Sequence, residues 1–199
     1  MEFSDVVRRR RMVRSFSGAP VPADVLDRLL DSALRGPSAG NTGGWDAVVL
    51  SGPAEMTRLW EATTTADWRA SSRRWAGLSQ APVAVVLFAH PEAYTARYGQ
   101  PDKASSGLDH DDWPVPYWFI DTGFPALLLL LGAVDAGLGG CFLGNFRGED
   151  ALKTALGVPG DRRYVGTVLL GPPGSDDPPS ASLARGRRSA DDVVHRGGW

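Results

Sequence analysis

The sequence predicts an α+β or α/β fold, because segments with helical periodicity alternate with short apolar strands along its 199 residues. From Pro22 to Arg35, apolar residues recur at helical spacing opposite a polar face, which is typical of an amphipathic helix. From Pro82 to Ala89 the chain is continuously apolar, which indicates a central strand covered on both faces. With 43% hydrophobic residues, the chain can bury a sizeable core as one domain spanning residues 1–199.

The remaining elements follow from the same patterns. Ser4 is expected to cap a short first helix that ends in the arginines. Residues 92–116 are polar and are expected to form a surface excursion or lid, or a disordered insertion. The other expected elements are a strand at 46–50, helical structure at 55–75, a buried central helix at 117–136, a strand ending in a Gly-Asn turn at 141–146, a helix at 149–156, a strand at 164–171, and an extended C-terminal arm at 172–199.

Charge and composition exclude several classes of protein. The formal net charge is only -2, so we expect no nucleic-acid partner. The apolar run from Phe124 to Val134 is shorter than the roughly 20 residues that a membrane span needs, so we expect no membrane partner. Cys141 is the only cysteine, and no spacing of metal-ligating residues predicts a metal site. No apolar run follows the first arginines, so we expect no signal peptide and a cytoplasmic location.

Five arginines lie within seven positions between Arg8 and Arg14. Such a cluster repels itself unless an anion lies in it, although arginines at a helix end also interact favourably with the helix dipole. A second basic cluster, Arg185 to Arg188, could join the first on one phosphate if the arm folds back. There is no Walker A or GxGxxG pattern and no nucleophile constellation. A phosphate cradle without acid/base machinery is typical of chemistry performed by an organic cofactor.

Five motifs together resemble the FMN-dependent nitroreductase family: RRRRMVRSF, PSAGNTGGW, GLGGCFLGNF, GVP and GRRSADDVVH. They span nearly the whole chain in the family's order. The resemblance implies a homodimer with a mainly antiparallel central sheet flanked by helices, and FMN at the subunit interface. It further implies NADH or NADPH as electron donor and ping-pong reduction of nitroaromatic, quinone or free flavin acceptors. No side chain is expected to be catalytic, because the flavin N5 carries the chemistry.

The resemblance also assigns cofactor-binding positions. Those matching the N-terminal motif, which contacts the phosphate, ribityl chain or pyrimidine edge, are Arg10, Arg11, Met12 and Arg14. Those matching the C-terminal pair that closes on the phosphate are Arg185 and Arg187. Those matching the loop that the other subunit lends to the flavin are Pro37, Ser38, Ala39 and Asn41. Those matching the turn whose backbone N–H groups face the flavin N5 and O4 edge are Gly144 and Asn145.

Three departures from the family pattern concern the cofactor and the substrate side. Met12 stands where the family usually has serine, Gly43-Gly44 replaces a common Gln-Pro, and Leu127-Leu128 replaces a common Gln-Asn. Two alternatives to a reductase therefore stay open. One is a flavin-dependent dehydrogenase or oxidase of a natural-product intermediate that passes electrons to oxygen. The other is a flavin-binding module without turnover.

Overall fold

The computed structural model describes residues 1–106, 113–145 and 148–199. Residues 107–112 of the predicted excursion and the end of the CFLGNF motif therefore lie outside the described residues. The described part contains one four-stranded sheet of order β1-β2-β4-β3, in which every neighbouring pair is antiparallel. Its strands are β1 (Trp45–Ser51), β2 (Val83–Ala89), β3 (Gly139–Leu143) and β4 (Arg163–Gly171). The α+β prediction is confirmed.

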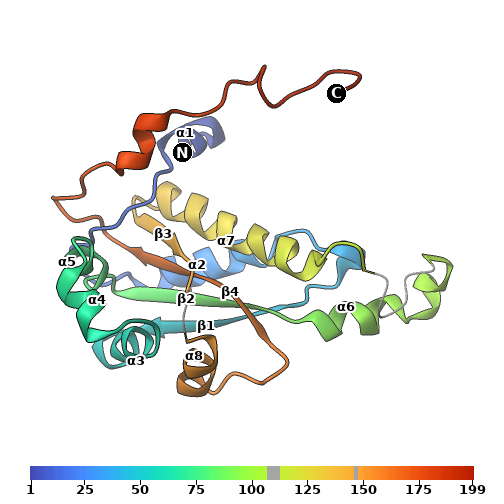
Figure 1. Cartoon of the computed structure of the whole chain (residues 1–199), viewed down its shortest axis with the longest axis horizontal. Coiled ribbons are helices and arrows are strands. Elements are labelled where there is room, and N and C mark those ends of the chain that lie inside the picture. Colours follow the sequence, from blue (N-terminus) through green and yellow to red (C-terminus); the bar gives the residue numbers. More distant parts are fainter. Residues whose placement is uncertain (107–112, 146–147) are drawn as a thin grey trace.

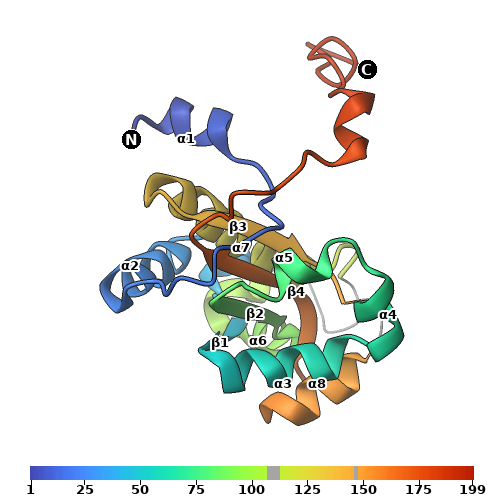
Figure 2. The ribbon, with the colours of Figure 1, turned by 90° about the vertical axis from the view of Figure 1, so that its left-hand side faces the viewer.

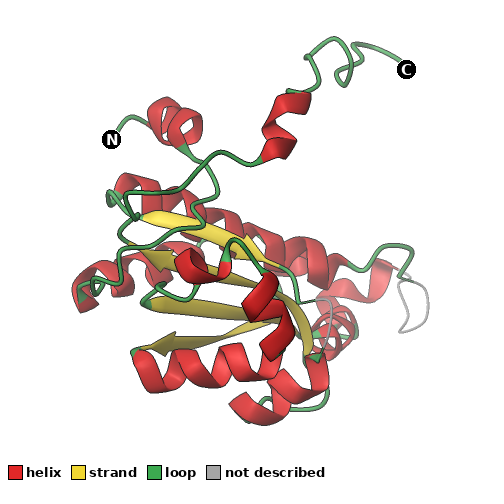
Figure 3. Cartoon of the chain, turned by 60° about the vertical axis from the view of Figure 1, so that its left-hand side comes forward, coloured by secondary structure: helices red, strands yellow, loops and turns green. Residues whose placement is uncertain are grey.

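Helices cover both faces of this sheet (Figures 1 and 3). One face packs against α2 (Ala23–Ala33) and α7 (Tyr117–Asp135). The other packs against α3 (Pro53–Thr63), α5 (Trp75–Leu78), α8 (Glu149–Leu156) and the N-terminal segment. The shorter α1 (Phe3–Arg9), α4 (Ala66–Ser71) and α6 (Pro91–Tyr98) lie outside these two layers.

The strand β2 shows why the sequence folds into three layers. Alternate side chains of a strand point to opposite faces, so Val83, Val85 and Leu87 enter the core with α7, and Val86 and Phe88 enter the core with α3. Every residue of the strand is buried. A continuous apolar run is therefore required, and the sequence prediction of a central strand is confirmed.

The helix predicted to be central and buried is α7, which packs against α2, β2, β3 and β4. By length and composition it could cross a membrane, but this packing accounts for much of its apolar character. One side of it remains outside the core, where Ile120, Phe124 and Leu127 are 36–47% exposed. These residues are spaced i, i+4 and i+7 and so form one continuous apolar stripe.

Two local predictions need correction. The residue that precedes α1 is Glu2, without a side-chain cap, and Ser4 lies inside the first turn, so the predicted serine cap is wrong. The segment after β2 is also less irregular than its polarity suggests. Residues 91–98 form α6, and its Tyr94 is fully buried.

The two ends of the chain leave the body on the same side (Figure 2). The C-terminal arm first pairs with the N-terminal segment, where Phe16 and Pro173 form an antiparallel bridge. It then runs outward through the short helix η3 (Ala181–Arg185), and residues 181–199 are exposed. The extended arm is confirmed.

Candidate functional site

The arginine-rich segment runs along the open edge of the sheet. Met12 forms a parallel bridge with Gly140 of β3, and the Val13 amide donates to the Gly140 carbonyl at 2.9 Å. The Phe142 amide donates to the Met12 sulfur at 3.4 Å. Met12, which replaces the family's serine, therefore covers part of the edge of β3 with a thioether.

A buried carboxylate from the arm holds this segment in place. The Asp177 side chain is only 5% exposed, and its Oδ1 accepts from the Arg14 amide at 3.1 Å. Its Oδ2 pairs with the Arg11 guanidinium. Arg11 therefore carries a charge that is already balanced, whereas Arg10 and Arg14 are half-buried and have no carboxylate partner among the described residues.

A further arginine, Arg74, comes from a distant part of the sequence. Burial raises the pKa of the Cys141 thiol to about 11, and the nearby charges of Arg14 and Arg74 oppose this rise. Both arginines, like the carboxylate of Asp177, are thus close enough for their charges to act on the Cys141 thiol. Within the described part of the chain neither forms an ion pair, and half-buried guanidinium groups of this kind are typical of oxyanion sites.

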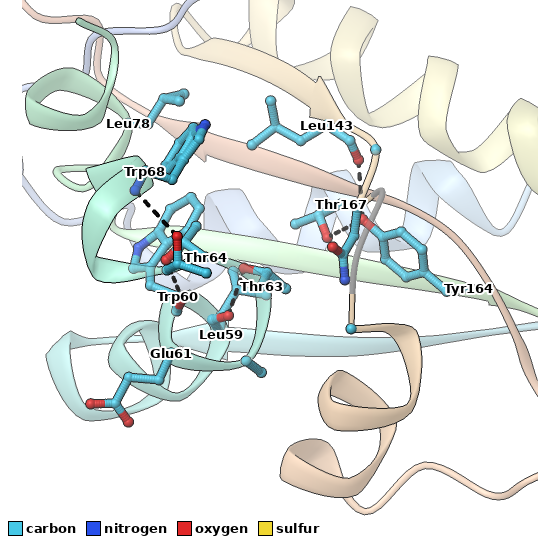
Figure 4. A pocket seen from close by; sticks show the side chains of 15 residues that line it. Leu59, Trp60, Glu61, Thr63, Thr64, Trp68, Leu78, Leu143, Tyr164 and Thr167 are labelled. Carbon is cyan, nitrogen blue, oxygen red and sulfur yellow. Dashed lines mark hydrogen bonds between the residues drawn. The ribbon is translucent and has the colours of Figure 1, made fainter. Parts of the chain in front are cut away.

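A cavity of about 650 Å³ opens at the C-terminal end of β3 (Figure 4). One wall comes from α3 and α4 and includes Trp60, Thr64 and Trp68, and the other comes from β3 and β4 and includes Leu143, Gly144, Asn145, Tyr164 and Thr167. This volume is in the range of small-molecule and cofactor sites. The cavity therefore lies on the same strand as the arginines.

The first wall is stiffened by aromatic rings that pack edge-on against one another. Trp75 packs edge-on against Trp60 at 5.4 Å between ring centroids and against Trp68 at 6.1 Å, and the Arg69 guanidinium lies 5.7 Å from its centroid. Two buried donors here, Trp60 Nε1 and Arg69 Nε, have no acceptor among the described residues. Rigid aromatic surface with spare donors suits a flat ligand that carries oxygen atoms.

The loop Pro37–Asn41 belongs to a different part of the molecule. Its Ala39 amide donates to Asp121 Oδ2 of α7 at 2.7 Å, and the Tyr94 hydroxyl donates to the same oxygen at 2.9 Å. The Arg97 guanidinium donates to the Gly40 carbonyl at 3.0 Å. The loop is thus held on the α7 side of the sheet and contributes nothing to the wall of the cavity.

The structure therefore brings together only some of the predicted positions within one chain. Arg14 lies in the segment beside the edge of β3, and Gly144 and Asn145 follow the same strand and line the cavity. The loop 37–41 lies elsewhere, and Arg185 and Arg187 are exposed on the outgoing arm (Figure 2). Convergence of Arg185 and Arg187 on the arginines of residues 10–14 stays a prediction, because a single protomer does not bring the two groups together.

Sequence reasoning did not single out the residues that support these positions. Asp177 lies in a proline-rich arm with no periodic signal, and no pattern singles out Arg74 among the arginines of its region. Asp121 did carry a signal, since it is the single acid within the apolar run from Tyr117 to Val134. An acid in such a run is expected to have buried donors around it.

One group of side chains has a metal-like arrangement. Ligand atoms of His90, Glu92 and Asp161 lie within 4.8 Å of one another. The Arg162 guanidinium already donates to Asp161 at 2.6 Å, so we assign no metal to this group.

Comparison with known proteins identifies the family. The sequence profile described as "Nitroreductase family" matches residues 7–172. The chain belongs to the nitroreductase family. Within this family, it is 30% identical to a protein named NADH dehydrogenase from Thermus thermophilus, over 88% of each chain.

Solved structures agree with the fold of this nitroreductase-family chain. A nitroreductase family protein from Clostridium novyi superposes with a TM-score of 0.70 at 26% identity, covering 88% of this chain and 87% of that one. A protein described as a putative nitroreductase, from Exiguobacterium sibiricum and solved in complex with FMN, has a TM-score of 0.74. At 18% identity, with 98% and 97% of the two chains covered, that similarity shows the fold alone.

One departure from the family's pattern has a packing explanation. A Cβ atom at Gly44 would lie 2.4 Å from Cε2 of the buried Tyr94 ring, so no larger residue fits without moving that ring. Glycine at this position lets Tyr94 reach Asp121, which anchors the loop 37–41.

Proposed function

We propose that this nitroreductase-family chain is an FMN-dependent oxidoreductase. The observation that carries the proposal is that half-buried arginines, which have no carboxylate partner among the described residues, and an aromatic-walled cavity lie along one strand. From Gly140, beside Met12, to Gly144 in the cavity the strand advances about 13 Å. An elongated ligand with an anionic end and a flat end fits this arrangement.

The residues present suit FMN in their chemistry. Arg14, Arg74 and Arg10 would hold the phosphate or the pyrimidine edge, and the cavity would hold the ring. When bound, FMN supplies hydride transfer from NADH or NADPH to a nitroaromatic, quinone or related acceptor in a ping-pong cycle. The chain's own role is to bind and orient the ring and to stabilise negative charge on it with nearby cations and amides.

The direction of the Gly144 amide supports such a role. On the edge strand β3, the Gly140 carbonyl and the Phe142 amide face outward toward Met12 and Val13. Groups two residues apart on a strand face the same way, so the Gly144 amide is also directed outward. No acceptor for it occurs among the described residues. It is available to donate to the N5 and O4 edge of a flavin.

We further propose that two copies complete the site. Besides the apolar stripe on α7, the neighbouring helix α1 exposes Phe3 (73%) and Val7 (46%), and α1 packs beside α7. Burial of such a stripe between two copies stabilises a dimer by about 25 cal/mol per Å². In a homodimer the loop 37–41 and the arm with Arg185 and Arg187 of one protomer reach the flavin of the other.

Binding and reduction are tested separately. The purified chain is expected to be yellow, or to gain flavin absorbance on titration with FMN. Arg14→Ala and Arg74→Ala should each weaken FMN binding at least about tenfold, because a hydrogen bond to a charged group contributes about 1.5–3 kcal/mol. The matched control is Arg73→Ala, because Arg73 is exposed and its neighbour Arg74 is half-buried. A protein that takes up no FMN contradicts the proposal.

Anaerobic stopped-flow mixing with NADH and NADPH then distinguishes the enzyme classes. Bleaching of the flavin band by either donor supports the reductase. A flavin that neither donor bleaches favours the dehydrogenase or oxidase of a natural-product intermediate. A bound flavin that turns over no acceptor at all favours the module.

A further inference from the structure

The hydroxyl of Tyr164 joins the two strands that form one wall of the cavity (Figure 4). It lies 3.1 Å from the Leu143 carbonyl oxygen and 3.0 Å from Thr167 Oγ1. A carbonyl can only accept, so the single phenolic proton goes to Leu143, and the Thr167 hydroxyl must donate to Tyr164. The result is a directed chain of two hydrogen bonds that ends on one peptide group.

That peptide group is the one that carries the Gly144 amide. The described part of the chain contains no cis peptide bond, and in a trans peptide the C=O and N–H groups point in opposite directions. Because the Leu143 carbonyl turns toward Tyr164 of β4, the Gly144 amide points away from β4. This agrees with the outward direction inferred from the alternation along β3.

A hydrogen bond accepted by the carbonyl of a peptide polarises the group and strengthens its N–H as a donor, by about 10–30%. We infer that Tyr164, supported by Thr167, is a positioning residue that sets the direction and donor strength of the Gly144 amide toward the flavin. This inference rests on the proposed FMN-dependent function. Tyr164 acts through the Leu143–Gly144 peptide and need not touch the cofactor.

The surroundings of Tyr164 keep its hydroxyl in this role. Burial raises the pKa of the phenol, so it remains protonated and able to donate at neutral pH. Its ring packs edge-on against Phe88 at 6.0 Å, and its amide donates to Glu149 Oε1 at 3.1 Å. The side chain is thus fixed by contacts that do not involve the hydroxyl, and Tyr164→Phe should keep the fold.

The test compares Tyr164→Phe with Thr167→Val, which keeps the shape of the side chain but removes its hydroxyl. The matched control is Tyr117→Phe, because the half-exposed Tyr117 ring stacks only on Trp113 among the described aromatic rings. The midpoint potential of bound FMN is measured by anaerobic dye equilibration. In the FMN-free proteins, the Gly144 amide proton is followed by NMR.

In Tyr164→Phe the preference of the protein for reduced over oxidised FMN should fall about two- to fourfold, because the weakened amide stabilises the reduced ring less. At 29.6 mV per tenfold change this lowers the midpoint potential by about 9–18 mV. The Gly144 amide proton should shift upfield. Thr167→Val should change both quantities in the same direction but less, and Tyr117→Phe should change neither.

The outcomes separate this inference from the function on which it rests. A wild-type chain that binds no FMN overturns both. If the wild type binds FMN while Tyr164→Phe keeps its potential and its Gly144 shift, only the inference on Tyr164 is overturned. Equal weakening of oxidised and reduced FMN binding would show that the hydroxyl only packs the wall, which also contradicts it.

Discussion

Replacement of Asp177 by alanine should weaken the attachment of the segment with Arg11 and Arg14 to the first part of the C-terminal arm. The carboxylate accepts the Arg14 amide at 3.1 Å inside the protein, and a hydrogen bond to a charged group contributes about 1.5–3 kcal/mol. The ion pair with Arg11 adds under about 1 kcal/mol, because the Arg11 side chain is 55% exposed and screened by water. We expect Asp177→Ala to lower the free energy of unfolding by about 2–3 kcal/mol.

For a chain of this length that loss corresponds to a fall in Tm of roughly 4–12 °C, measured by circular dichroism without FMN. The matched variant Arg11→Ala removes only the exposed ion pair and should lower Tm by less than about 4 °C. Asp177→Asn, which keeps an acceptor for the Arg14 amide, should fall between the two. Equal effects of Asp177→Ala and Arg11→Ala would refute the reasoning, since the amide bond would then contribute nothing.

Three further perturbations test the packing, the buried thiol and the dimer. Gly44→Ala should cost about 1–3 kcal/mol in chemical denaturation because its Cβ meets the Tyr94 ring, whereas Gly160→Ala, with open space around it, should cost little. The pKa of the Cys141 thiol is raised from 9.0 to about 11, so with rising pH the thiol loses its proton in the unfolded chain before it does so in the folded one. The free energy of unfolding should therefore fall by roughly 2–3 kcal/mol between those pH values. Cys141→Ala should remove this fall when the free energy of unfolding is measured by urea titration at each pH. Leu127→Glu, on the exposed stripe of α7, should give monomers in sedimentation and lose FMN; a dimer that persists would contradict the proposed interface.

The elements of this fold could be predicted from the sequence because their signals are local. The periodicity of residues 22–35 produces α2, the apolar run at 82–89 produces β2, and the run that begins at Tyr117 produces α7. Gly157 ends α8 in the left-handed conformation that glycine adopts readily after a helix, with φ of 66°. The motifs likewise single out Arg10, Arg14 and Gly144, whose binding of a cofactor stays a prediction.

The tertiary structure decided which of these groups lie close to one another. Arg11 is balanced by a carboxylate 166 positions away, while Arg74 comes to stand near Arg14 beside Cys141. The same structure places the loop 37–41 on the opposite side of the sheet from the cavity. These pairings depend on the path of the arm and on the packing of helices across the sheet, which no local pattern encodes.

The hydroxyl of Tyr164 shows the difference most directly. From the sequence alone, Tyr164 is expected at the start of one strand and a Gly-Asn turn at the end of another. Only the antiparallel register of β3 and β4, which pairs Leu143 with Thr167, brings that hydroxyl to the Leu143 carbonyl. Register is set by long-range strand pairing, so the contact that orients the Gly144 amide exists only in the folded chain.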